Sequence, residues 1–128
     1  MAIDVLIADR DPLVRRVLRL LLELSGDIHV VRDLASAEGV VQASRVDRPA
    51  VVLVDQDLLE RAGYSLPELG RQLPGVAILA LALYPGRAAP GMPRIAVLPK
   101  DCPHDDLIAT VRRLAAQREP PDAGRPAG

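Results

Sequence analysis

Lysine and aromatic residues are nearly absent from this sequence of 128 residues. It has one lysine, Lys100, two tyrosines, and neither phenylalanine nor tryptophan. An aromatic fraction of 2% leaves no series of rings on which the bases of a single strand could stack. The net charge of −1 and the isoelectric point near 6.1 provide no general attraction to phosphate groups. We therefore expect no direct binding to nucleic acid.

Cysteine and long apolar runs are also scarce. The only cysteine, Cys102, cannot form an internal disulfide bond. Residues 1–4, Met-Ala-Ile-Asp, lack the charged and apolar regions of a signal peptide, and no apolar run is long enough to span a membrane. These absences argue against a disulfide-rich secreted domain and against a membrane protein. We expect a cytoplasmic protein.

The composition that remains is that of one folded domain. The hydrophobic fraction of 49% is sufficient for a packed core, which leucine, valine, isoleucine and alanine must build. Residues 119–128 are rich in proline and glycine and have little to bury. We expect a folded domain over residues 1–118 and a disordered tail over residues 119–128.

The stretch Ala50–Asp57, Ala-Val-Val-Leu-Val-Asp-Gln-Asp, organises the rest of the chain. A continuous apolar run rich in β-branched residues is typical of a strand buried on both faces in the middle of a parallel sheet. Asp55 would lie at the carboxyl end of that strand, where open α/β sheets bind their ligands. An aspartate here could also do no more than begin a turn. The other charged positions decide between these readings.

Strand and helix patterns alternate along the whole chain. The strands are predicted over residues 3–8, 28–32, 50–55, 76–83 and 95–98, and the helices over residues 12–24, 36–44, 65–73 and 104–117. Residues 58–64 are predicted to form a loop. Residues 84–94 contain too many prolines and glycines for a helix.

This alternation predicts an α/β fold with right-handed crossovers. The fold class is a flavodoxin-like, doubly wound, five-stranded parallel sheet in the order 2-1-3-4-5. The fourth helix of this fold, which would connect the fourth and fifth strands, is expected to be short or absent. In that order the first, third and fifth strands end around one crevice. Asp9, Asp55 and Lys100, which follow or end these three strands, are therefore expected to be neighbours.

The first predicted helix begins with Asp11 as N-cap and Pro12 in the first helical position. Its apolar residues at i, i+3, i+4 and i+7 are expected to face the core; they are Val14, Val17, Leu18 and Leu21. The arginines between them are expected to form a solvated face or, alternatively, to contact an acidic partner helix; they are Arg15, Arg16 and Arg19.

Two motifs carry a resemblance to a known family. They are Val-Leu-Ile-Ala-Asp-Arg-Asp-Pro-Leu-Val-Arg over residues 5–15 and Leu-Pro-Lys-Asp-Cys-Pro over residues 98–103. Over Ile3 to Gln117 the sequence resembles the receiver domain of two-component response regulators, the CheY-like family, and most closely its NarL/FixJ type. The resemblance implies that Asp55 is the phosphoacceptor, that Asp9 binds Mg²⁺ and that Lys100 contacts the phosphoryl group.

The sequence departs from the family pattern in several places, two of which affect the site, so it resembles an atypical, degenerate receiver. The second acid of the family's metal pair falls on Arg10, and the hydroxyl residue that ends the fourth strand falls on Ala82. A Mg²⁺ site with Asp9, Asp55 and Asp57 as candidate ligands is therefore expected to be weak or lost. At 4 Å, Arg10 would gain on the order of 4 kcal/mol of Coulomb energy with Asp55 before desolvation. We expect Arg10 to take the place of the metal.

Three functional hypotheses follow. The first is an atypical single-domain response regulator in a phosphorelay, not an enzyme, with a histidine kinase or another signalling protein as partner. The second is a pseudo-receiver that contacts proteins without phosphorylation. The third is a haloacid-dehalogenase-like phosphohydrolase with Asp55 as nucleophile and Asp57 as general acid. A homodimer, if one forms, is expected to use the first or the last helix.

Overall fold

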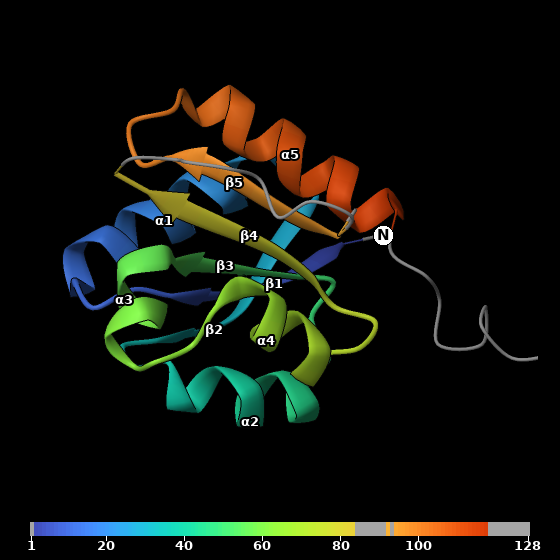
Figure 1. The fold of residues 1–128 in the computed structure, drawn as a ribbon. Coiled ribbons are helices and arrows are strands. Elements are labelled where there is room, and N and C mark those ends of the chain that lie inside the picture. Colours follow the sequence, from blue (N-terminus) through green and yellow to red (C-terminus); the bar gives the residue numbers. More distant parts are fainter. Residues whose placement is uncertain (1, 84–91, 93, 118–128) are drawn as a thin grey trace, which may run out of the picture.

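The computed structural model describes residues 2–83, 92 and 94–117. Its centre is a five-stranded sheet in the order β2-β1-β3-β4-β5, and all four strand pairs are parallel (Figure 1). The strands are β1 (Ile3–Ala8), β2 (Ile28–Leu34), β3 (Val51–Asp55), β4 (Ala77–Ala82) and β5 (Ile95–Pro99). The predicted fold class and strand order are confirmed.

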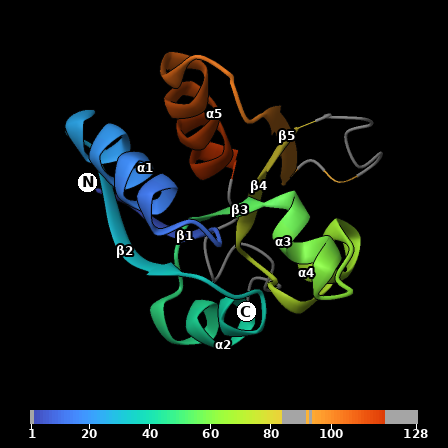
Figure 2. The same cartoon turned by 90° about the vertical axis from the view of Figure 1, so that its left-hand side faces the viewer.

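Helices cover both faces of this sheet. They are α1 (Pro12–Leu24), α2 (Glu38–Asp47), α3 (Gln56–Arg61), α4 (Leu66–Gln72) and α5 (His104–Gln117). α1 and α5 lie on one face, and α2, α3 and α4 lie on the other (Figure 2). None of the helices formed by the described residues is long and apolar enough to cross a membrane.

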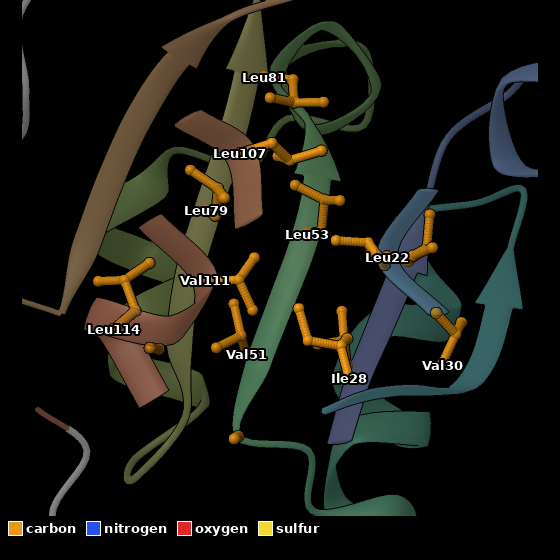
Figure 3. Packing of buried hydrophobic residues seen from close by; sticks show 14 residues of the cluster. Leu22, Ile28, Val30, Val51, Leu53, Leu79, Leu81, Leu107, Val111 and Leu114 are labelled. Carbon is orange, nitrogen blue, oxygen red and sulfur yellow. The ribbon is translucent and has the colours of Figure 1, made fainter. Parts of the chain in front are cut away.

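β3 separates two apolar layers. Val51 and Leu53 belong to the layer under α1 and α5, which Figure 3 shows, whereas Val52 and Val54 belong to the layer on the opposite face. All four side chains are at most 1% exposed. Because successive residues of a strand point to opposite faces, a strand buried on both sides needs an uninterrupted apolar run. The run ends at Asp55, which also ends the strand.

Capping side chains fix where two helices begin. The Asp11 carboxylate accepts a hydrogen bond from the Leu13 N–H at 2.9 Å, and Pro12 occupies the first turn of α1. At α4, the Ser65 hydroxyl oxygen accepts from the Glu68 N–H at 3.2 Å. Each cap satisfies one of the N–H groups that a helix start leaves without a partner.

The predicted loop over residues 58–64 is wrong in its first half. α3 begins directly after Asp55, and its Leu58 and Leu59 side chains are buried against the sheet. An ion pair between Arg61 Nε and Asp57 Oδ2, 2.8 Å apart, links one turn of α3 to the next. The burial of these two leucines thus stabilises α3, which is too short to give a periodic apolar pattern in the sequence.

Two further predictions lie largely outside the described residues. In the connection from β4 to β5, described residues 83, 92 and 94 form no helix, and residues 84–91 and 93 lie outside the described part. The predicted tail over residues 119–128 lies outside it completely.

The predicted inner face of α1 is correct only for Leu18, which packs against the apolar layer under α1 and α5. Leu22 is its only buried residue, whereas Val14 and Val17 are 37% and 45% exposed. The reason is a pair of arginines that reach Asp33 of β2: Arg15 Nε lies 3.4 Å and Arg19 Nη2 3.0 Å from carboxylate oxygens of Asp33. Arginine can bury its stem and still keep its charge paired, so these residues compete with leucine for the inner face.

An ion pair joins α5 to the turn between α1 and β2. Arg112 donates two hydrogen bonds of 2.9 Å to the Asp27 carboxylate, and together with the Ser25 hydroxyl group this lowers the Asp27 pKa to about 2. A lowered carboxyl pKa contributes stability that is complete above pH 3.8 and lost as the pH falls through about 2.

Arg112→Ala is expected to raise the pKa of Asp27 from about 2 toward 3.8, because the main hydrogen-bond donor is lost. The pH dependence of the Asp27 carboxyl carbon shift measures this. Arg113→Ala is the matched control, since Arg113 is exposed and makes no ion pair with a described residue. An Asp27 pKa that stays near 2 without Arg112 would contradict this account.

Candidate functional site

Three parallel strands bring charged groups to one edge of the sheet. Asp9 follows β1, Asp55 ends β3 and Lys100 follows β5. All three line a cavity of ≈ 540 Å³ at this edge. The other lining residues are Arg10, Asp11, Val14, Leu18, Asp57 and Leu81. The crevice predicted from the strand order is therefore present.

Asp55 and Lys100 form the closest charged contact of this cavity. Lys100 Nζ lies 2.8 Å from Asp55 Oδ1; the Asp55 side chain is 6% exposed and that of Lys100 34%. The Lys100 N–H donates to the Ala82 carbonyl oxygen at 2.9 Å, which fixes the lysine backbone at the end of β4. The contact with Asp55 raises the pKa of Lys100, and the Asp9 charge raises it further. Lys100 is therefore a fixed cation facing the end of β3.

Asp9 is the second buried carboxylate, with 7% of its surface exposed. Its Oδ1 accepts a hydrogen bond from the Asp11 N–H at 2.9 Å. Burial raises the pKa of Asp9 and the Asp55 charge raises it as well, whereas the Asp11 N–H and Lys100 lower it. Two carboxylates that repel each other share one ammonium group, so the site has a deficit of positive charge.

Arg15 positions Asp9, a role that its place in the predicted helix does not indicate. Its guanidinium group donates to the Asp9 carbonyl oxygen at 2.6 Å and also pairs with Asp33. The Arg15 side chain is 17% exposed. The sequence does contain one indication of this role elsewhere in the chain. Asp33 follows the second predicted strand, which neighbours the first in the predicted order, so an arginine early in the first helix could reach it.

Asp57 lines the same cavity but is engaged elsewhere. It lies in the first turn of α3, is half exposed, and pairs with Arg61 rather than with a residue across the cavity. Its suggested role as a metal ligand remains a prediction.

Arg10 does not form the expected ion pair with Asp55. It is exposed at the rim of the cavity and makes no ion pair with a described residue. Lys100 instead occupies the position next to the Asp55 carboxylate. The physical reason is that Arg10 follows β1 in an exposed segment, whereas β5 delivers Lys100 directly to the sheet edge.

Ala82 ends β4 beside Lys100, as predicted, and is 6% exposed. It borders a second hollow of ≈ 310 Å³ whose lining includes Asp57, Glu60, Leu83 and Lys100. A methyl group at this position offers no hydrogen bond to anything bound at Asp55.

The carboxylates of this cavity provide some, but not all, of the oxygen ligands that a Mg²⁺ ion needs. Among the described residues, no three acidic, histidine or cysteine side chains gather as a metal site. The buried Asp55 Oδ1 accepts no hydrogen bond of good geometry from a described residue, so its partner is the Lys100 charge alone. Mg²⁺ commonly binds through one or two carboxylates and several waters, and Asp9 and Asp55 provide such a pair.

Known structures share this architecture. The chain is similar to the receiver domain of NarL from Mycobacterium tuberculosis, with 21% identity over 91% of this chain and 98% of that one and a TM-score of 0.73. It is similar to the response regulator domain of Thermotoga maritima CheB, with 15% identity, coverage of 94% and 100%, and a TM-score of 0.74. It is also similar to the isolated receiver domain of Salmonella enterica RcsB, solved with the phosphomimetic BeF₃⁻, with 18% identity, coverage of 98% of both chains and a TM-score of 0.73.

No protein-family model matches the sequence, and the curated proteins contain no match. The chain has the CheY-like receiver fold of two-component response regulators.

Proposed function

We propose that this domain is an atypical response-regulator receiver that accepts a phosphoryl group on Asp55 in a phosphorelay. One observation carries the proposal: a buried carboxylate at the end of the central strand faces the ammonium group of the only lysine, 2.8 Å away. A histidine kinase or a related phosphodonor protein is the corresponding partner.

The chemistry requires a nucleophile and fixed positive charge. A carboxylate oxygen of Asp55 attacks the phosphorus of a phosphohistidine, the P–N bond breaks, and the imidazole leaves and takes up a proton. The product is an acyl phosphate. Lys100 offsets the charge on the phosphoryl oxygens, and Arg15 holds the backbone that carries Asp9.

Asp9 and Asp55 would hold Mg²⁺, which supplies further positive charge toward the phosphoryl oxygens when it is bound. Arg10 stands where another carboxylate would strengthen this site, and its positive charge opposes the cation. We therefore propose a weak Mg²⁺ site.

A pseudo-receiver that contacts proteins without phosphorylation is the second candidate. Two observations favour it: the Ala82 methyl group beside Lys100, and Arg10 at the cavity rim, which pairs with no acid in the described part of the chain. A phosphohydrolase is disfavoured, because the suggested general acid Asp57 pairs with Arg61 and is half exposed.

Titration with beryllofluoride and Mg²⁺, followed by backbone amide NMR, tests the proposal. The amide signals of Asp9, Asp55 and Lys100 are expected to shift in the wild type, because BeF₃⁻ mimics a phosphoryl group on the carboxylate. Asp55→Asn keeps the size of the side chain, removes the charged oxygen and should abolish these shifts. Unchanged spectra of the wild type at saturating beryllofluoride would favour the pseudo-receiver.

A further inference from the structure

α1 carries an apolar stripe on the side that faces away from the sheet. The exposed fractions are 66% for Leu13, 45% for Val17, 58% for Leu20 and 80% for Leu24. Spacings of four, three and four residues place these side chains in one line along a helix. The face is distinct from the one that packs in the core through Leu22.

The stripe is not a random scatter of surface residues. Of the seven large hydrophobic residues exposed in the described part of the chain, five lie on α1. The two outside α1 are Val46 and Leu83. α1 lies at the margin of the fold, and α5 lies on the same face of the sheet (Figure 2).

The rest of this sequence offers no segment suited to cover the stripe. Residues 84–91, 93 and 118–128 contain no leucine, isoleucine or valine. An exposed apolar stripe of this kind marks a contact surface, and its own spacing and charges suit a second copy of the chain.

The spacing of the stripe is symmetric about its own midpoint. In an antiparallel pair of α1 helices, Leu13 lies opposite Leu24 of the second copy, and Val17 lies opposite Leu20. A two-fold axis through the midpoint makes the stripe complementary to itself, as an isologous interface requires.

The charges beside the stripe favour the same arrangement. Arg16 and Glu23 lie along one flank, seven residues apart, so an antiparallel pair sets each Arg16 against Glu23 of the second copy. Arg16 is exposed and has no ion pair with a described residue. Glu23 Oε2 accepts from the Val30 N–H at 3.1 Å and lies 3.5 Å from His29 Nδ1, whereas Oε1 remains for a residue of the second copy. A parallel pair would set no acid opposite Arg16.

The other flank is apolar. Val14, 37% exposed, and the half-buried Leu21 follow Leu13 and Leu20 in the helix. The antiparallel arrangement sets Val14 of each copy against Leu21 of the other, which widens the apolar contact.

We propose that a second copy of this chain docks on α1, with the two α1 helices antiparallel and in register about a two-fold axis between residues 18 and 19. A helix of 13 residues gives a contact only about 20 Å long. Interfaces of that size are weak, and the dimer is expected at a protein concentration of about 100 µM rather than at nanomolar levels.

Analytical ultracentrifugation of the full chain tests the surface. Leu20→Asp places two carboxylates in the apolar contact and is expected to raise the dissociation constant at least ~10-fold. Val46→Asp is the matched control, because Val46 is 73% exposed on α2 and should leave the dimer intact. A wild type that is monomeric at about 100 µM, or equal effects of the two variants, would overturn the proposal.

Paired charge reversals test the register. Arg16→Glu and Glu23→Arg alone each set like charges opposite each other and should be monomeric, while an equimolar mixture should form a heterodimer. Circular dichroism checks that Glu23→Arg keeps its fold without the hydrogen bond to Val30. If that variant does not fold, Arg16→Glu alone must still weaken the dimer at least ~10-fold. Folded variants that fail to associate on mixing would refute the antiparallel pairing.

Discussion

Lys100→Met is expected to lower the free energy of unfolding by about 1–3 kcal/mol at pH 7. The variant keeps the length and apolar stem of the side chain but leaves Asp9 and Asp55, which are 7% and 6% exposed, without a cation. Removing one partner of a buried pair is costly because the other charge remains desolvated. The estimate is below that for a fully buried pair, since the lysine side chain is 34% exposed and water screens part of its charge. Urea denaturation curves of the wild type and the variant, fitted with a common m-value, measure this difference in unfolding free energy.

A second variant separates the lost charge from lost packing. Asp55→Asn/Lys100→Met removes both charges, so its unfolding free energy should recover toward that of the wild type. If the double variant is as unstable as Lys100→Met, the loss comes from packing, and the pairing contributes little.

The pH dependence of the Lys100→Met effect has a definite sign. The Lys100 pKa is raised in the fold, so its contribution is complete below pH 10.5 and is lost as the pH rises through the folded value. Toward acid, the penalty in Lys100→Met should shrink as Asp9 takes up a proton and needs no counter-charge, and because burial raises the pKa of Asp9 this begins above pH 3.8. A difference between wild type and variant that stays constant from pH 3 to pH 11, roughly the range in which these groups titrate, would contradict the assignment.

Arg10→Asp is expected to lower the Mg²⁺ dissociation constant at least ~10-fold. The substitution removes a cation at the rim of the cavity and adds a carboxylate next to Asp9, and each change favours a divalent ion. Isothermal titration calorimetry in chelator-treated buffer measures the affinity. In the absence of metal, the added negative charge should make Arg10→Asp less stable than the wild type.

The control for this prediction is Arg113→Asp, which makes the same charge change on α5 at a residue without an ion pair among the described residues. It should leave Mg²⁺ affinity nearly unchanged. Equal gains in both variants would show that net charge, rather than a specific site at Asp9, governs Mg²⁺ binding.

The sheet could be predicted from the sequence because each strand is a short, continuous apolar segment. An apolar run that stops at Asp55 defines both the central strand and the residue at its edge. The strand order then follows from the alternation of strands and helices, and it brings Asp9 and Lys100 to the same edge.

The face of α1 could not be read in this way. Its apolar residues form a single arc that is wider than the part of the helix in contact with the sheet, so periodicity does not select which part of the arc packs there. The choice depends on Asp33, which pairs with Arg15 and Arg19 across the α1–β2 contact. An ion pair between distant positions has no signature in a single sequence.

Arg10 illustrates the limit of reading a site by charge alone. Proximity in sequence to Asp9 predicted an ion pair with Asp55, but Lys100 already occupies that position from β5. The substitution leaves a cation at the rim instead of a bridge within the site.

The most direct test of Asp55 as the phosphoacceptor is to identify the residue that carries a phosphoryl group. The wild type is incubated with acetyl phosphate or phosphoramidate and Mg²⁺, and borohydride then converts any aspartyl phosphate into homoserine for peptide mass spectrometry. The account predicts homoserine at position 55 in the wild type and none in Asp55→Asn. Absence of homoserine at position 55 in the wild type, or its appearance at Asp9 or Asp57 instead, would contradict the assignment of Asp55 as the phosphoacceptor.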